Sequence, residues 1–143
     1  MTSATVDSIE RTVHKTNEWL DQLAGELGTD DTREAWRVLR AFLQVLRQRL
    51  TVDEAAQLAA QLPHLLRGVF YEGFDPSNEP ERIRDRDEFL ARFAQRAQLE
   101  SPDHAERAAA AATRVLRRHI SEGEFDDVLA QLPADIRAVL AQA

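Results

Sequence analysis

Apolar residues recur along the chain at spacings of three and four, and no segment sustains a strict alternation of apolar and polar residues. This period is typical of helices that bury one face, and it argues against strands. The first predicted helix covers about residues 8–27, and its apolar side carries Ile9, Val13, Leu20, Leu23 and Leu27. The pattern therefore predicts an all-α protein.

Polar capping residues predict where the helices begin. In a capping box, a Ser, Thr or Asp accepts a hydrogen bond from a free backbone amide, and a glutamate three residues later reaches back to the amide of the cap. This pattern begins at Asp7, Asp31, Thr51, Asp85 and Ser121. Ser101 and Pro102 add a cap followed by proline, and short helices are expected to begin at Pro63 and Pro133. The signals predict about eight helices.

The chain resembles itself at an offset of 70 positions. Residues 11–70 align without gaps with residues 81–140, and the sequence Ala-Gln-Leu-Pro occurs at 60–63 and again at 130–133. We interpret this as two pseudo-repeated four-helix units, the first at about residues 8–70 and the second at about residues 85–140.

A joining segment, residues 71–84, is rich in turn-forming residues and short. We expect Phe70, Tyr71 and Phe74 to pack at the joint between the units, because aromatic side chains in a short linker usually serve burial. A single unit of about 60 residues would be only marginally stable. We therefore expect one domain over residues 1–143, a compact helical bundle with a shared core.

The second helix of the second unit is rich in alanine, with Ala105 and residues 108–112. Small side chains let neighbouring helices approach closely, so we expect this helix to be central and packed under bulky residues of the first unit. The alternative is a face for self-association.

Composition limits the classes of function. The chain has 143 residues, of which 43% are apolar and 30% charged, as in an ordinary globular domain. The absence of cysteine excludes disulfides, thiolate nucleophiles and metal sites built from thiolates. With no targeting pattern and no apolar run of membrane-spanning length, we expect a cytoplasmic protein that engages no membrane. Lys15 is the one lysine among 18 basic residues, which together with the alanine content suggests a bacterial source.

No residue pattern indicates catalysis. The histidines His14, His64, His104 and His119 never stand three or four positions apart, and the sequence has no glycine-rich phosphate loop or nucleophile elbow. The segment from Asp75 to Glu79 lacks the glycine and glutamate of a calcium loop, so we interpret it as a turn. We expect no catalytic residue, no bound metal and no cofactor.

Arginines form the one non-random polar feature, on the second helix of each unit. At 100° per residue the arginines of the first unit fall within an arc of about 80° opposite the apolar side, and those of the second within about 100°. Trp36 lies at the edge of the first arc. The candidate anion-binding or partner-binding surface comprises Arg33, Arg37, Arg40, Arg47, Arg107, Arg114, Arg117, Arg118 and Trp36. Its structural alternative is a solvated face whose charges pair with acids of neighbouring helices.

Two copies of a Leu-Pro-x-x-[Leu/Ile]-Arg segment, at 62–67 and 132–137, and the joining Tyr-Glu-Gly-Phe-Asp-Pro segment resemble the bacterial family catalogued as domain of unknown function 2267. The resemblance covers roughly residues 10–140. It implies a compact all-helical cytoplasmic protein and carries no catalytic residue, because the family has no established activity. Phe74 departs from the tryptophan expected at its position.

Three functions remain open. The first is a non-catalytic helical interaction module of the bacterial cytoplasm that binds an unknown protein partner or a second copy of itself. The second is a binder of nucleic acid or another polyanion through the arginines, which the net charge of −7 disfavours. The third is an enzyme or small-ligand binder with a pocket between the units, lined by Tyr71, Phe74 and Trp36.

Overall fold

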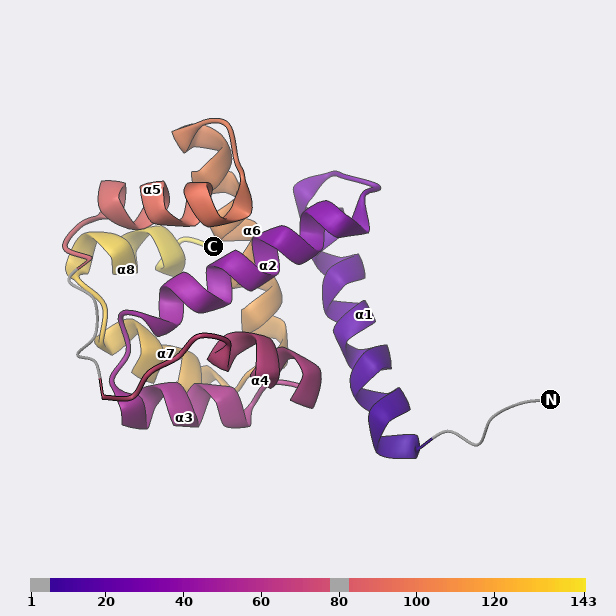
Figure 1. Cartoon of the computed structure of the whole chain (residues 1–143). Coiled ribbons are helices and arrows are strands. Elements are labelled where there is room, and N and C mark those ends of the chain that lie inside the picture. The colour runs from indigo at the N-terminus through magenta and orange to yellow at the C-terminus, as the bar shows by residue number, and fades with distance from the viewer. Residues whose placement is uncertain (1–5, 78–82) are drawn as a thin grey trace.

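The computed structural model describes residues 6–77 and 83–143, and within these ranges the chain forms eight helices and no strand (Figure 1). The helices are α1 (Asp7–Leu27), α2 (Thr32–Arg47), α3 (Val52–Ala60), α4 (His64–Tyr71), α5 (Arg86–Ala97), α6 (Pro102–His119), α7 (Glu122–Ala130) and α8 (Ala134–Ala141). The all-α prediction is confirmed. Across the described ranges, no helix combines the length and the apolar character needed to cross a membrane.

Five of the predicted caps form as expected. Asp31, Thr51, Asp85, Ser101 and Ser121 each accept a hydrogen bond from an amide in the first turn of the following helix. The cap predicted at Asp7 is wrong. The amides of Ile9 and Glu10 donate to the carbonyl of Val6, so the helix begins one residue earlier and Asp7 lies inside its first turn. Pro63 and Pro133 are themselves the N-caps, so α4 and α8 each start one residue later than predicted.

Helices α2 and α6 supply most of the core. Helix α2 packs against α1, α4, α5 and α6, and α6 packs against α1, α2, α5 and α8. Each neighbour of α2 thus has its counterpart at the 70-residue offset among the neighbours of α6. Helices α3 and α7 pack on each other beside these two, α3 along the lower edge of Figure 1. One cluster of buried apolar side chains draws residues from all eight helices.

The alanines of α6 are buried as predicted. Ala105, Ala108, Ala109, Ala111 and Ala112 are at most 1% exposed, whereas Ala110 is half-buried. Because these side chains are small, α6 lies close to α1, α2 and α5, and the core is formed there largely by the neighbours' bulkier residues. The alternative of an exposed self-association face does not fit this burial.

The arginine that ends each Leu-Pro motif has a structural role. Arg67 donates from Nε to the carbonyl of Ala59 at 2.9 Å, and Arg137 donates to the carbonyl of Leu132 at 3.1 Å. The last carbonyls of a helix have no partner within it, and a guanidinium satisfies them while favouring the negative end of the helix dipole. The motif therefore stabilises the turns from α3 to α4 and from α7 to α8.

The joining segment begins with the expected aromatic cluster. Phe70 is fully buried, and Tyr71 lies against both Phe70 and Phe74, with ring centroids 5.4 and 5.6 Å apart. Gly73 has a φ of 75°, a conformation that favours glycine and turns the chain back toward α2. Asp75 accepts from the amide of Ser77 in a local turn, and the part of the predicted segment at 78–82 lies outside the described residues.

Candidate functional site

The arginines of α2 do not form one exposed face. Arg33 and Arg40 are exposed, Arg37 is half-buried, and Arg47 is only 4% exposed. Arg47 donates to the carbonyls of Phe70 and Glu72 at 2.7 and 2.8 Å, because the chain after α4 folds over the end of α2 and brings free carbonyls there. The assignment of Arg47 to a binding surface is therefore corrected to a structural role. Burial lowers its pKa, and the positive charge of Arg96 lowers it further.

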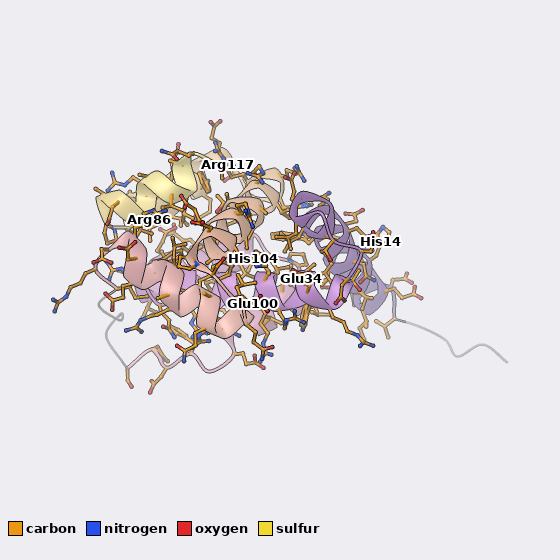
Figure 2. All side chains as sticks on the ribbon, turned by 90° about the horizontal axis from the view of Figure 1, so that it is seen from above. His14, Glu34, Arg86, Glu100, His104 and Arg117 are labelled. Atoms are coloured by element: carbon orange, nitrogen blue, oxygen red, sulfur yellow. The ribbon has the colours of Figure 1, made fainter. Side chains whose placement is uncertain are left out.

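The arginines of α6 are largely paired with other parts of the chain. Arg114 donates to Glu26 of α1 at 2.8 Å, and Arg118 binds the other oxygen of the same carboxylate. These two hydrogen bonds lower the pKa of Glu26. Arg117 donates to the carbonyl of Ala143 at 3.1 Å, at the end of the molecule where Figure 2 labels it. In this half of the predicted surface the arginines are therefore mostly paired within the protein, as expected for a solvated structural face.

A cavity of about 300 Å³ gathers the remaining candidates between α2 and α5. Its lining residues, which we call the arginine pocket, are Trp36, Arg37, Arg40, Ala41, Gln44, Arg96 and Gln98. Three guanidinium groups line it, and no carboxylate of the described residues does, although the protein as a whole is acidic. The Nε of Arg37 is buried and has no hydrogen-bond acceptor within the described ranges. Arg96 reaches across from α5 and donates to Gln44 at 2.7 Å.

A carboxylate of the chain itself, that of Glu72, binds beside this pocket. Glu72 accepts from Nε of Arg40 at 2.9 Å and from the amide of Gln44 at 3.1 Å. The hydrogen bond from Arg40 is the largest cause of the lowered pKa of Glu72, and that from Gln44 is the next. Arg40 and Gln44 therefore already hold one oxyanion, whereas Glu72 makes no contact of this kind with Arg37.

A second cavity, of about 250 Å³, occupies the aligned place between α1 and α6. Arg107 takes there the place of Arg37, but Glu26 takes the place of Arg96. Because Glu26 pairs with both Arg114 and Arg118, it offsets part of the positive charge of this cavity. Of the two aligned cavities, the arginine pocket is the more cationic one, with three arginines in its lining against two.

The three residues predicted to line one pocket, Tyr71, Phe74 and Trp36, do not all line the arginine pocket. Trp36 lines the arginine pocket, whereas Tyr71 and Phe74 pack on each other and on Phe70 and do not line it. The guanidinium carbon of Arg47 lies 5.5 Å from the centre of the Phe74 ring, so this aromatic pair covers the end of α2.

Two of the four histidines, His64 and His119, line one cavity of about 310 Å³, and the other two make separate contacts. His104 of α6 is 3.9 Å from Glu34 of α2, and Figure 2 shows this pair well away from His14 on α1. His119 stacks on Trp19 at 4.5 Å between ring centroids, and burial lowers its pKa. None of these contacts unites two histidines.

Sequence reasoning missed a group of carboxylates where α3 meets α7. Glu54 and Glu124 are each only 6% exposed. Their carboxylates and that of Asp127 supply oxygens that all lie within 4.8 Å of one another. We call these three residues the carboxylate cluster. Within the described part of the chain it is the one place where three His, Asp or Glu side chains converge in this way.

Local capping explains why the two glutamates meet. The hydroxyls of Thr51 and Ser121 cap the amides of Glu54 and Glu124, as the sequence predicts. In a full capping box the glutamates would accept the amides of Thr51 and Ser121 in return.

In this structure the backbone amides of Thr51 and Ser121 donate instead to side chains from the opposite helix pair. The amide of Thr51 donates to Gln131 at 3.0 Å, and the amide of Ser121 donates to Gln61 at 2.7 Å. The two glutamine side chains thus replace the glutamates as acceptors and leave Glu54 and Glu124 to face each other. The sequence signal was their alignment: Glu54 with Glu124, and Gln61 with Gln131, stand 70 positions apart.

The carboxylate cluster has an excess of negative charge in a buried place. Burial, the hydrogen bond with Glu54, and the negative charges of Glu54 and Asp127 raise the pKa of Glu124 to about 8. Glu124 therefore keeps a proton near neutral pH. Oε1 of Glu54 and Oε2 of Glu124 remain buried without any hydrogen-bond partner within the described ranges.

The sequence model of the family described as "Uncharacterized conserved protein (DUF2267)" matches residues 16–139. The chain belongs to this family. The match spans all eight helices in whole or in part, so both the arginine pocket and the carboxylate cluster of this DUF2267 protein lie within the family's region. No curated protein matches the sequence significantly.

Proposed function

We propose that this DUF2267 protein is a non-catalytic binding module of the bacterial cytoplasm, and that its arginine pocket recognises a phosphate group on its ligand. The observation that carries the proposal is the convergence of Arg37, Arg40 and Arg96 on one cavity that no carboxylate of the described residues lines. Guanidinium groups bind phosphate oxygens through paired, charge-assisted hydrogen bonds. The cavity of about 300 Å³ is at the lower end of the size range for small-ligand sites.

The electrostatics of the pocket support an anionic ligand. The neighbouring charge of Arg96 lowers the pKa of Arg47, so positive charges repel one another on this side of α2. Arg37 contributes a buried Nε–H donor without an acceptor, which is costly unless a ligand supplies one. Glu72 binds Arg40 and Gln44 as an oxyanion would, so one end of the pocket is already arranged for such a group.

The end of α5 also supports binding at this place. Gln98 has a φ of 59°, in the left-handed region, whereas Gly28 takes this conformation at the aligned end of α1. A residue with a side chain pays roughly 1–2 kcal/mol for it. Gln98 lines the arginine pocket, so the chain keeps a residue in a strained conformation at this cavity.

The pocket supports binding rather than catalysis. Its lining side chains are hydrogen-bond donors, amides, an alanine and an indole, and none of them is a nucleophile or a general base. A nucleic acid would need a continuous cationic surface, but the pairing of Arg114 and Arg118 with Glu26 interrupts the arginines. We therefore place nucleic acid second.

Titration with inorganic phosphate and with phenyl phosphate, followed by calorimetry, tests the proposal. We expect Arg37→Gln to weaken binding about tenfold or more, since a charge-assisted hydrogen bond contributes roughly 1.5–3 kcal/mol. The matched control is Arg33→Gln, because Arg33 lies one turn earlier on α2, is exposed, and does not line the cavity. Arg107→Gln is the control for the aligned cavity.

The possible results separate the hypotheses. Phosphate binding that Arg37→Gln weakens and both controls leave unchanged supports the arginine pocket. A single-stranded oligonucleotide that binds more tightly than phenyl phosphate, and that loses affinity equally in Arg33→Gln and Arg37→Gln, would establish the nucleic-acid alternative instead. Absence of binding to all three probes would refute an anion site.

A further inference from the structure

The carboxylate cluster between α3 and α7 holds buried oxygens that lack a partner. Oε1 of Glu54 and Oε2 of Glu124 make no hydrogen bond within the described ranges. Leaving a buried acceptor unsatisfied costs about 1–3 kcal/mol, and more for a charged group. Both side chains are more than nine-tenths buried, and both point into the cluster.

We propose that Glu54, Glu124 and Asp127 bind a divalent metal cation. Their oxygens lie within 4.8 Å of one another, a separation that two ligands on opposite sides of one cation reach at metal–oxygen distances of about 2.4–2.5 Å, as around Ca²⁺. Asp127 follows Glu124 by one helical turn and is exposed, so the cluster is open to solvent on that side. Water can therefore complete the coordination shell, as it commonly does around Mg²⁺.

The ligand set determines the class of metal. It consists of carboxylate oxygens alone, without histidine, and the chain has no cysteine. Oxygen ligands suit Mg²⁺, Ca²⁺ and Mn²⁺, whereas zinc and copper sites normally include nitrogen or sulfur. The charges that act on Glu124 are those of Glu54 and Asp127, and all of them are negative. A divalent cation would offset two of these negative charges, whereas a single proton offsets one.

Binding would have two consequences within the fold. A carboxylate must be deprotonated to bind a metal, so the metal affinity should rise with pH. It would also connect α3 to α7, which belong to the two aligned halves of the chain. The hydrogen bonds of Gln61 and Gln131 across the same contact hold the two glutamates in place without the metal.

Mn²⁺ is the probe for the first experiment, because its paramagnetic resonance signal distinguishes free from bound metal. The protein is first treated with EDTA and returned to metal-free buffer at pH 7.5. We expect one Mn²⁺ per chain, an increase in Tm on binding, and release of about one proton in weakly buffered solution. Competition by Mg²⁺ and Ca²⁺ then ranks the metals.

Carboxamide variants locate the site. We expect Glu54→Gln and Glu124→Gln each to weaken Mn²⁺ binding at least tenfold, because even residues behind the direct ligands change metal affinity by 10–100-fold. Asp127→Asn should weaken it as well. The matched control is Asp126→Asn, which removes the neighbouring exposed carboxylate outside the cluster and should leave the affinity unchanged.

Glutamine keeps the shape of glutamate and can donate to its partner, and circular dichroism shows whether each variant is folded. Folded wild-type protein that binds none of the three metals at about 10 mM, well above the weakest calcium sites, would overturn the proposal. Binding that Asp126→Asn weakens as much as Asp127→Asn would overturn it too, since the metal would then associate with general surface charge. A wild type without metal binding beside a stabilised Glu124→Gln would show that the pair holds only a proton.

Discussion

Replacing Glu124 with glutamine should change how the stability of the protein depends on pH. In the folded protein the pKa of Glu124 is raised to about 8, from 4.5 for an unperturbed glutamate, first by burial and then by Glu54 and Asp127. Between these pH values the folded chain keeps a proton on this carboxyl and the unfolded chain loses it. Stability from this group is therefore fully present below pH 4.5 and is lost as the pH rises through 8.

The magnitude follows from the two pKa values. Each pH unit between 4.5 and 8 should lower the free energy of unfolding by about 1.4 kcal/mol, up to about 5 kcal/mol over the whole window. Glutamine is neutral at every pH, so Glu124→Gln removes this slope. The variant should match the wild type near pH 5 and exceed its stability increasingly above pH 7. The amide can still donate to Glu54, so the contact between α3 and α7 is kept.

Chemical denaturation at pH 5, 6, 7, 8 and 9, with EDTA present, measures the effect as the difference between variant and wild type. Contributions from other groups, such as His119 with its lowered pKa, cancel in that difference. Glu122→Gln is the matched control, because Glu122 is an exposed glutamate on the same helix outside the carboxylate cluster. If the two stability curves stay parallel across the window, Glu124 does not hold a proton in the folded state and the reasoning is refuted.

Two further predictions concern packing and the arginine pocket. Ala108→Leu should lower the free energy of unfolding by about 1–3 kcal/mol, because Ala108 is fully buried in the centre of the bundle. Ala110→Leu, at a half-buried position of the same helix, should lower it less, and chemical denaturation measures both. Gln98→Gly should raise stability by up to about 1 kcal/mol by relieving the left-handed conformation, and should weaken phosphate binding; unchanged affinity would exclude Gln98 from the site.

Local signals in the sequence predicted the helices well. Capping hydroxyls and carboxylates act within one turn, so Asp31, Thr51, Asp85, Ser101 and Ser121 could be recognised without knowledge of the rest of the fold. Asp7 failed because the carbonyl of Val6 already starts the helix, and a sequence pattern does not show which backbone carbonyl accepts first.

The arginines of α2 and α6 show where such reasoning ends. Helical spacing correctly places them opposite the apolar side of their own helix, but it contains no information about other segments that cover that side. Arg47 is buried and donates to a carbonyl in the last turn of α4, and Glu26 from α1 binds Arg114 and Arg118. Only the tertiary contacts separate these structural arginines from Arg37, which lines the arginine pocket.

The carboxylate cluster escaped prediction for a related reason. The glutamates of two capping boxes have a sufficient local role, so nothing in either segment suggests a second one. The contact requires Gln61 and Gln131 to take over the capped amides from the opposite helix pair. The alignment of the two halves does contain this information, because Glu54 and Gln61 recur together as Glu124 and Gln131 at the same offset.

Charge differences at aligned positions point to function more directly than the arginine pattern does. Packing requires shape, so aligned core positions need only similar volume, and a change of charge at an aligned polar position has no packing explanation. Arg96 stands where α1 has Glu26, and this difference makes one of two aligned cavities more cationic than the other. Asp127 stands at the position aligned with Gln57 of α3. It adds a third carboxylate to the buried pair, on which no positive charge of the described residues acts to offset the negative ones. If the halves served stability alone, Gln57 and Asp127 would be interchangeable. Asp127→Gln should then leave Mn²⁺ binding and the pH dependence of unfolding unchanged, whereas the cluster requires both to change.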